Sequence, residues 1–518
     1  MKWAHFLHIY QPADQHPGIL EKIVNESYRP ILRGLLKTPD AKITLNVSGT
    51  LVEKLFEHGY RDVIDDIKAL LELGRMELTG SAKYHAFLPL IPEEEVERQI
   101  RLNEETMRKY FGELFVKKGF FSPEMAYSPK VASVVERLGY KWILLDEVSI
   151  CEPGQTLESK VMDKIYKIKG TNLQAFFREK QPSNIIMGAL VRSAESLKKV
   201  MEKRLPTNTY VVTAMDGETF GHHRPGFELP LFDILKSPDF KGVFISDLPS
   251  YFPDIEEVVP KDSTWASSAV DVARNDPYNL WFTPNNQIHS YEWELVDLAV
   301  RVVNGSQYSD EKYPHMLEEV MNWEEMNSDQ KYHEERKREW VQARGMLDAA
   351  LNSDPMWWAS AKPWWSVEMI EKGMNALYKV VNRVPDVSEV DRDKAEDLYK
   401  NILFTAHEWQ RAGMVDKMAA DDAAERKIPL SKRFAAEGTY VAILKALRDE
   451  EIAVAGRREY EQAIKWRDSQ YKLERDLDIY DAVHIIDLFK VEGDFAKFEE
   501  YLREYRQKYR AVSKGQPE

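Results

Sequence analysis

The sequence predicts an α/β protein whose parallel sheet is closed or nearly closed and is followed by a large helical region. Two observations support this fold class. Short apolar, β-rich runs recur through the first half of the chain, with helical patterns between most of them. From about residue 286 the strand patterns give way to helical ones. Counting strands leaves a barrel and an open doubly wound sheet as alternatives.

Seven runs in the first half are expected to form parallel strands. They lie at Trp3–Ile9, Lys42–Val47, Arg75–Thr79, Gly119–Phe121, Lys141–Leu145, Tyr210–Met215 and Gly242–Ile245. The segment Lys164–Arg178 instead reads as a hairpin with its turn at Gly170–Asn172, and we expect it to be an insertion on the barrel.

One β-α-β unit is especially clear. After the strand Gly119–Phe121, Ser128 and Pro129 supply a helix N-cap and a first-turn proline. An apolar stripe at helical spacing follows, and Gly139 ends the helix before the strand Lys141–Leu145. Because such crossovers join parallel strands, these two strands should pair in parallel.

The second half is predicted to be helical. Expected helices lie at 286–303, 312–351, 366–383, 389–412, 431–453, 456–476 and 478–509. The segment Pro385–Val387 is a plausible boundary between an inner set and a C-terminal set. The expected units are therefore a barrel over 1–285, a helical region packed on the barrel over 286–385, and a C-terminal helical domain over 386–518.

Composition narrows the classes of partner. The 518 residues carry a net charge of −15, which gives no general attraction to nucleic acid or anionic membranes. A single cysteine excludes an internal disulfide framework. Neither a signal peptide nor a run of about 18 apolar residues is visible, so we expect a cytoplasmic protein. Oligomeric state does not follow from the sequence.

Two acids lie where strands end and loops begin, the place where barrel enzymes carry their chemistry. Glu124 follows Phe120–Pro123, and Asp216 follows Tyr210–Met215. Paired carboxylates suit cleavage of a glycosidic bond, since one can attack the anomeric carbon while the other donates a proton. Asp-Gly is also a common turn dipeptide, so Asp216 alone could be a turn residue.

Histidines and tryptophans are further candidates. His8 alternates with apolar residues on the first strand, so a sugar contact and a structural role are both open, and His85 is similar. His222 and His223 suggest a metal site of deacetylase type, although adjacent histidines rarely reach one ion. Flat aromatic faces can stack on sugars or pack in a core. Candidate platforms are Trp265, Trp281, Trp357, Trp358, Trp364 and Trp365, while Trp293, Trp340, Trp409 and Trp466 are expected to pack.

Four blocks, in order, resemble glycoside hydrolase family 57. The first is Leu7–Pro12, which includes Tyr10 and Gln11, and the second is Gly74–Ser81, continuing to His85 and Pro89–Leu90. The third, Gly119–Ala126, is similar to the family's nucleophile block, and the fourth, Met215–Gly221, to its acid/base block. The family usually has a second histidine directly before Gln-Pro, and here that position is Tyr10.

The resemblance implies an incomplete (β/α)7 barrel with a helical domain that helps to close the groove, and retaining chemistry on α-glycosidic bonds, usually in α-1,4-glucans. By position, Glu124 is expected to be the nucleophile and Asp216 the general acid/base. Glu77 and Glu218 would orient sugar hydroxyls or tune the catalytic pair. Apart from the resemblance, His222 is expected to contact either the substrate or the residues that hold it. The resemblance implies neither metal nor cofactor. An α-galactoside substrate and a non-catalytic carbohydrate-binding homologue remain alternatives.

Overall fold

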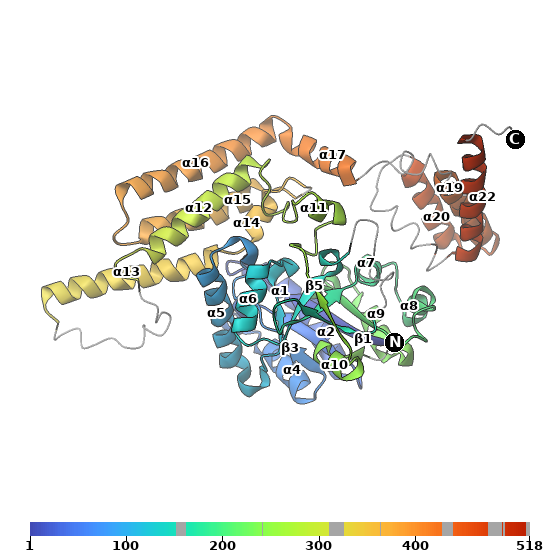
Figure 1. The fold of residues 1–518 in the computed structure, drawn as a ribbon, viewed down its shortest axis with the longest axis horizontal. Helices are drawn as coiled ribbons and strands as arrows, with labels where there is room; N and C mark the ends of the chain where they lie inside the picture. The colour runs from blue at the N-terminus through green and yellow to red at the C-terminus, as the bar shows by residue number, and fades with distance from the viewer. Residues whose placement is uncertain are drawn as a thin grey trace.

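The computed structural model describes residues 1–151, 162–240, 242–309, 326–362, 364–426, 439–474, 489 and 493–513. Figure 1 shows a barrel surrounded by helices, with a layer of long helices lying along one side of it and a small bundle beyond. The barrel comes from the first half of the chain, and the other two parts from the second half.

The strands form two five-stranded sheets. In the first, β3, β2, β1 and β8 lie side by side and β9 adds to β1; in the second, the order is β10, β6, β7, β5 and β4. Except for β6 with β7, every pair is parallel. Their bounds are β1 Lys2–Ile9, β2 Ile43–Val47, β3 Met76–Leu78, β4 Gly119–Phe121, β5 Trp142–Asp146, β6 Ile165–Ile168, β7 Gln174–Arg178, β8 Tyr210–Asp216, β9 Gly242–Val243 and β10 Ile255–Val258.

Two short contacts join the sheets into a ring. Past the end of β3, Gly80 donates its N–H to Gly119 O at 2.8 Å and accepts from Phe121 N at 2.9 Å. A Cβ at Gly80 would lie 2.0 Å from the Tyr140 hydroxyl, so only glycine allows this approach. On the far side, Glu179 N donates to Val212 O at 2.9 Å and links β7 to β8. Within the described residues, short contacts rather than continuous ladders close the ring, and the predicted incomplete barrel is confirmed.

The hairpin prediction needs a correction. β6 and β7 do pair antiparallel across the expected turn. However, β7 is not an insertion, because it pairs in parallel with β5 and occupies a place in the ring between β5 and β8. The expected seventh strand, 242–245, is only the two residues of β9, which pair with the beginning of β1. β6 and β10 extend the second sheet outside the ring.

Helices cover the outside of the barrel (Figure 1), and the helix expected after Ser128 forms. The unit β4–α6–β5 is parallel as predicted, and Ser128 caps α6 by accepting from Val131 N at 3.4 Å. The helices of this half are α1 Pro17–Ile23, α2 Arg29–Leu36, α3 Gly49–Glu57, α4 Arg61–Glu72, α5 Glu93–Phe111, α6 Pro129–Arg137, α7 Lys180–Met187, α8 Ala194–Met201, α9 Glu228–Lys236, α10 Leu248–Tyr251 and α11 Ala269–Ala273.

The helical layer shares one apolar core with the barrel. Buried residues of the second sheet and of α12, α13, α15 and α16 belong to a single cluster. The layer comprises α12 Gln287–Asn304, α13 Ser328–Ala350, α14 Asp354–Trp358, α15 Val367–Arg383, α16 Glu389–Arg411 and α17 Met414–Arg426. α16 packs against α12 and α15, across the boundary expected at 385, so we propose that the layer ends after α17. The part of the expected helix 312–351 before residue 326 lies outside the described residues.

A separate small core holds the last helices together. It is built from α19 Thr439–Gly456, α20 Tyr460–Glu474 and α22 Phe495–Ser513, with Trp466 and Phe489 buried between them. Parts of the expected helices 431–453 and 478–509 lie outside the described residues. Within the described ranges, no helix is long and apolar enough to span a membrane.

Candidate active site

A pocket of about 520 Å³ lies at the carboxyl ends of the barrel strands and is closed on one side by the helical layer. Eleven of the residues predicted from the sequence as catalytic or sugar-binding line it. They are His8, Tyr10, Gln11, His85, Glu124, Asp216, Glu218, Trp265, Trp281, Trp357 and Trp364. The carboxyl ends of parallel strands are where barrel enzymes place their reacting groups.

Glu124 is held by an unusual backbone and by one tryptophan. The turn after β4 puts Glu124 at φ 61°, in the left-handed region that non-glycine residues rarely adopt. Trp265 secures it twice, since its backbone N–H donates to Glu124 O at 3.1 Å and its indole Nε1 donates to Glu124 Oε2 at 2.7 Å. The other oxygen, Oε1, lies 4.0 Å from His85 Nε2. The carboxylate therefore has a fixed direction into the pocket.

Asp216 ends β8 beside His8, its register partner on β1. Burial raises the pKa of Asp216 to about 6, and the nearby charge of Arg178 opposes that rise. Burial also raises the pKa of Glu124 to about 8, with the charge of Asp216 adding to the effect and the Trp265 hydrogen bond opposing it. Burial thus raises the pKa of both acids, and it raises that of Glu124 further than that of Asp216.

A third acid, Glu218, is held by two donors. Tyr28 and Gln11 both donate to its Oε1, at 2.5 Å and 3.3 Å. Burial, followed by the charge of Asp216, raises the pKa of Glu218 to about 7. Gln11 is in turn fixed by Gln15, which donates to its amide oxygen at 2.6 Å.

Neutral aromatic rings form the wall beside Glu124. Tyr10 and His85 stack at 4.0 Å between centroids, and His8 lies 5.3 Å from His85. Burial lowers the pKa of His8 to about 4 and the pKa of His85 well below its ordinary value, so both imidazoles are neutral near pH 7. His8 Nδ1 is 2.8 Å from Asn46 Oδ1. Such rings can exchange hydrogen bonds with sugar hydroxyls without adding charge.

The helical layer supplies one acid that the sequence analysis did not single out, and one of the predicted tryptophans. Asp354, the first residue of α14, accepts a hydrogen bond from the Tyr10 hydroxyl at 3.2 Å, and burial raises its pKa to about 6. Trp364 stacks on Trp357 at 4.7 Å and is 45% exposed. Further lining residues not assigned a role from the sequence are Arg178, Asn184, Met187, Ala214, Met215, Ala266, Leu280 and Lys362.

Four predicted contacts lie outside the pocket, and one of them, Trp365, packs on the core and stacks on Trp409 at 6.2 Å. Glu77 pairs in register with Thr44 near the beginning of β2, where its Oε1 accepts from Thr44 Oγ1 at 2.7 Å. This is the opposite end of the strand from the pocket. His222 is bound to Glu26 at 2.7 Å, and its neighbour His223 lines the pocket instead. Trp358 stands edge-on to Trp357 at 4.9 Å and packs on the core.

A metal centre built on His222 and His223 gains no support from the geometry. In the part of the chain that the structure describes, no three His, Cys, Asp or Glu side chains gather closely enough to hold a metal ion. Trp281, by contrast, lines the pocket but is also packed, because it is 1% exposed and stacks on Phe87 at 4.9 Å.

A parallel barrel with buried paired carboxylates and tryptophans around one pocket is the arrangement typical of glycosidases. Comparison with known families agrees. The model of glycosyl hydrolase family 57 matches residues 4–258, and the chain belongs to this family through that N-terminal half. The resemblance seen in the four sequence blocks is thereby confirmed.

Individual relatives are more distant. The chain is 30% identical to an alpha-amylase of Pyrococcus horikoshii over 152 residues, which are 29% of this chain and 23% of the relative. It is 26% identical to a 4-alpha-glucanotransferase of Thermococcus litoralis over 152 residues, 29% of this chain and 22% of the relative. The matched segment thus spans less than a quarter of the length of these curated relatives.

Solved structures share the fold. A branching enzyme of family 57 from Pyrococcus horikoshii superposes with a TM-score of 0.55 at 15% identity, covering 77% of this chain and 94% of that one. The 4-alpha-glucanotransferase from Thermococcus litoralis gives 0.52 at 18% identity, covering 73% and 58%. At these identities the likeness concerns the fold, which includes part of the helical half.

Proposed function

We propose that this protein is a retaining glycoside hydrolase or transglycosylase that acts on α-1,4-linked glucans, with Glu124 as nucleophile and Asp216 as general acid/base. The observation that carries the proposal is that these acids, from the ends of β4 and β8, line one pocket and feel each other's charge. The names of the relatives, alpha-amylase and 4-alpha-glucanotransferase, support the substrate class.

The proposed reaction has two steps. Glu124 attacks the anomeric carbon as the bond to the leaving oxygen breaks, and Asp216 gives its proton to that oxygen. Water or a sugar hydroxyl then attacks the glycosyl-Glu124 ester, and Asp216 takes the proton of the attacking group. Because the pKa of Glu124 is raised above that of Asp216, a proton shared by the pair near neutral pH resides on Glu124 in the free protein, and it has to pass to Asp216 before the first step begins.

The other pocket residues support recognition of a neutral sugar chain. Trp357 and Trp364 offer flat faces for stacking on sugar rings, and Glu218 and Asp354 are acceptors for hydroxyl groups. The neutral imidazoles of His8 and His85 can bind hydroxyls beside Glu124.

Incubation with maltoheptaose tests the proposal. Shorter maltooligosaccharides alone would indicate hydrolysis, and a ladder of shorter and longer products would indicate transfer. Glu124→Gln should remove turnover while the circular dichroism spectrum is unchanged. Products that keep the α-anomer, followed by NMR, would support retention. Binding of maltoheptaose without turnover by the wild type, or full activity of Glu124→Gln, would contradict the proposal; turnover only of α-galactosides in a panel of chromogenic α-glycosides would contradict the substrate class.

A further inference from the structure

Three neighbouring strands of the barrel end in residues of alternating charge. Asp146 ends β5, Arg178 ends β7 and Asp216 ends β8. Asp146 and Arg178 are register partners, and the hydrogen bond from Glu179 N to Val212 O brings the end of β7 against β8. An anion, a cation and a second anion therefore follow one another around the rim of the ring.

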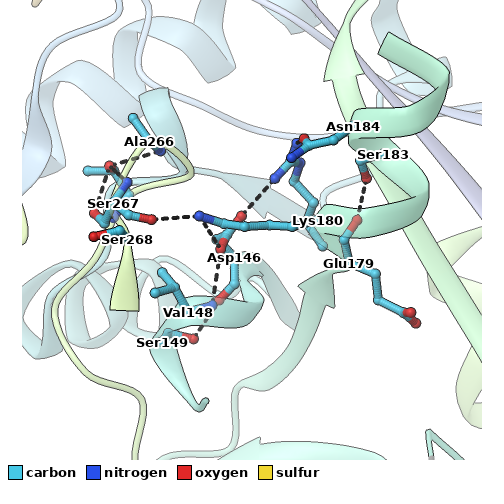
Figure 2. Close-up of polar contacts among 12 residues, drawn as sticks. Asp146, Val148, Ser149, Glu179, Lys180, Ser183, Asn184, Ala266, Ser267 and Ser268 are labelled. Carbon is cyan, nitrogen blue, oxygen red and sulfur yellow. Dashed lines mark hydrogen bonds and ion pairs between the residues drawn. The ribbon is translucent and has the colours of Figure 1, made fainter. Parts of the chain in front are cut away.

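Asp146 is fully buried, and both of its carboxylate oxygens are bound to neighbouring groups. Its Oδ2 accepts from Arg178 at 2.9 Å, and its Oδ1 accepts from Val148 N at 3.0 Å. Lys180 Nζ lies 3.4 Å from Oδ1 and also donates to Ser267 O at 2.5 Å. Figure 2 shows Lys180 reaching from α7 between Asp146 and the loop at Ser267. A buried carboxylate of this kind requires its cationic partners, because an unpaired buried charge is costly.

Arg178 is fixed by three hydrogen bonds and still faces the pocket. Its guanidinium donates to Asp146, to Ala214 O through Nε at 2.8 Å, and to Asn184 Oδ1 at 2.8 Å. Arginine has five N–H donors, so one remains on each terminal nitrogen. Arg178 and Asn184 line the pocket together with Asp216. Among the described residues no ion pair links Arg178 to Asp216, so the guanidinium acts on that acid across a gap.

We propose that Arg178, locked in place by Asp146, is a positioning residue that stabilises the negative charge Asp216 acquires when it protonates the leaving oxygen. In that step the proton moves from Asp216 to the glycosidic oxygen, the bond from that oxygen to the anomeric carbon breaks, and Glu124 forms the new bond to the carbon. Charge then develops on Asp216, where a fixed cation in a buried site is most effective. The inference rests on the proposed function.

Other groups around Asp216 add to the local field. Glu124 and Glu218 repel its negative charge, since its charge raises the pKa of each. The remaining charged or titratable groups at Asp216 or in the same pocket are Tyr28, His8, Tyr10, His85, His223, Asp354 and Lys362. Arg178 is the cation whose charge opposes the raised pKa of Asp216. Its loss should therefore make the acid pair hold its proton more tightly.

Three variants test the roles of the charged residues Asp146 and Arg178 through the pH dependence of kcat/KM. Arg178→Met removes a positive charge, so the profile should move to higher pH by roughly one unit. Asp146→Asn leaves Arg178 bound to Ala214 O and Asn184 but less compensated, so the profile should move to lower pH. The double variant, with Arg178→Met and Asp146→Asn together, leaves the net charge unchanged, so its pH profile should lie close to that of the wild type. Damage to the fold would not move the profile in opposite directions.

Leaving-group dependence separates an effect on proton transfer from a general loss. Arg178→Met should slow the turnover of alkyl α-glucosides roughly tenfold more than the turnover of 2,4-dinitrophenyl α-glucoside. The leaving oxygen of the alkyl glucosides needs a proton, whereas the dinitrophenyl leaving group needs little assistance. Arg178→Lys should recover part of the difference. Arg204→Met is the matched control, because Arg204 makes a similarly buried pair with Glu179 that does not line the pocket.

The outcomes distinguish this inference from the function on which it rests. If the wild type turns over no α-glycoside, the proposed function fails and this inference with it. If the wild type is active but Arg178→Met and Asp146→Asn move the profile in the same direction, or if Arg178→Met slows both glycosides equally, then only the role of Arg178 is overturned.

Discussion

The two walls of the pocket differ in origin and in chemistry. The barrel wall contributes Glu124, Asp216 and Glu218 from strand ends, and burial raises the pKa of each. The helical wall contributes Asp354 and stacked tryptophans from α14 and the segment that follows it. The walls touch where Tyr10 donates to Asp354 and where Ser353 N donates to His85 O at 3.1 Å. The difference suggests that the barrel wall carries the reaction and the helical wall carries recognition.

The largest difference in kcat/KM should appear between variants of two acids of the barrel, Glu218 and Glu77. Glu218→Gln keeps the shape of the side chain but removes the charged acceptor of Tyr28 and Gln11, so kcat/KM on maltoheptaose should fall roughly 30-fold, about 2 kcal/mol. Glu77→Gln, at the other end of the strands, should change kcat/KM less than about threefold. Steady-state kinetics measure both. A larger loss with Glu77→Gln would show that pocket lining does not identify the functional acid.

The cost of burying the ionised carboxylate of Glu124 should appear in the free energy of unfolding. Because the pKa of Glu124 in the folded protein is about 8 and its ordinary value is 4.5, its burial costs nothing below about pH 4.5 and the full amount above about pH 8. Glu124→Gln should therefore match the wild type near pH 4 and exceed its free energy of unfolding by about 2 kcal/mol near pH 9.

Urea denaturation at the two pH values measures this difference. The exposed acid Glu21 offers the control, since Glu21→Gln should give no gain at either pH. A Glu124→Gln variant that is less stable than the wild type at pH 9 would contradict the idea that the ionised carboxylate is held there at a cost.

The smallest effect should come from the helical wall. Trp364→Ala removes an exposed stacking face, so KM for maltoheptaose should rise roughly fivefold, about 1 kcal/mol, with kcat unchanged. Trp358→Phe, outside the pocket, should leave both constants within about twofold. If Trp364→Ala instead lowers kcat, the division of labour between the two walls is wrong.

The acids of the barrel wall could be predicted from the sequence because the pattern that places them is local in the chain. A strand pattern that ends in an acid places that acid at the rim, and parallel strands share one rim. The same reasoning failed for Glu77, because a strand of three residues does not reveal which part of the longer β2 it pairs with. It also misjudged β7, whose hairpin with β6 is visible locally but whose pairing with β5 is not.

The tryptophans of the helical wall were candidates from the sequence, but its acid, Asp354, could not be found in this way. Ser353, Asp354 and Pro355 read as an ordinary helix start, with proline in the first turn. What makes Asp354 special is its partner Tyr10, which is 344 positions away in the chain. Only the tertiary structure brings such residues together, and a single sequence contains no periodic signal for the encounter.

The apolar core that continues from the barrel into α12 and α16 has a consequence for protein engineering. A fragment cut at residue 285 would expose side chains that the intact chain buries, at about 1.5–3 kcal/mol for each large aliphatic group. The helical layer is thus no accessory that can be exchanged between homologues as a unit. Redesign of what the pocket accepts has to proceed by substitution within it, with both halves kept from the same parent.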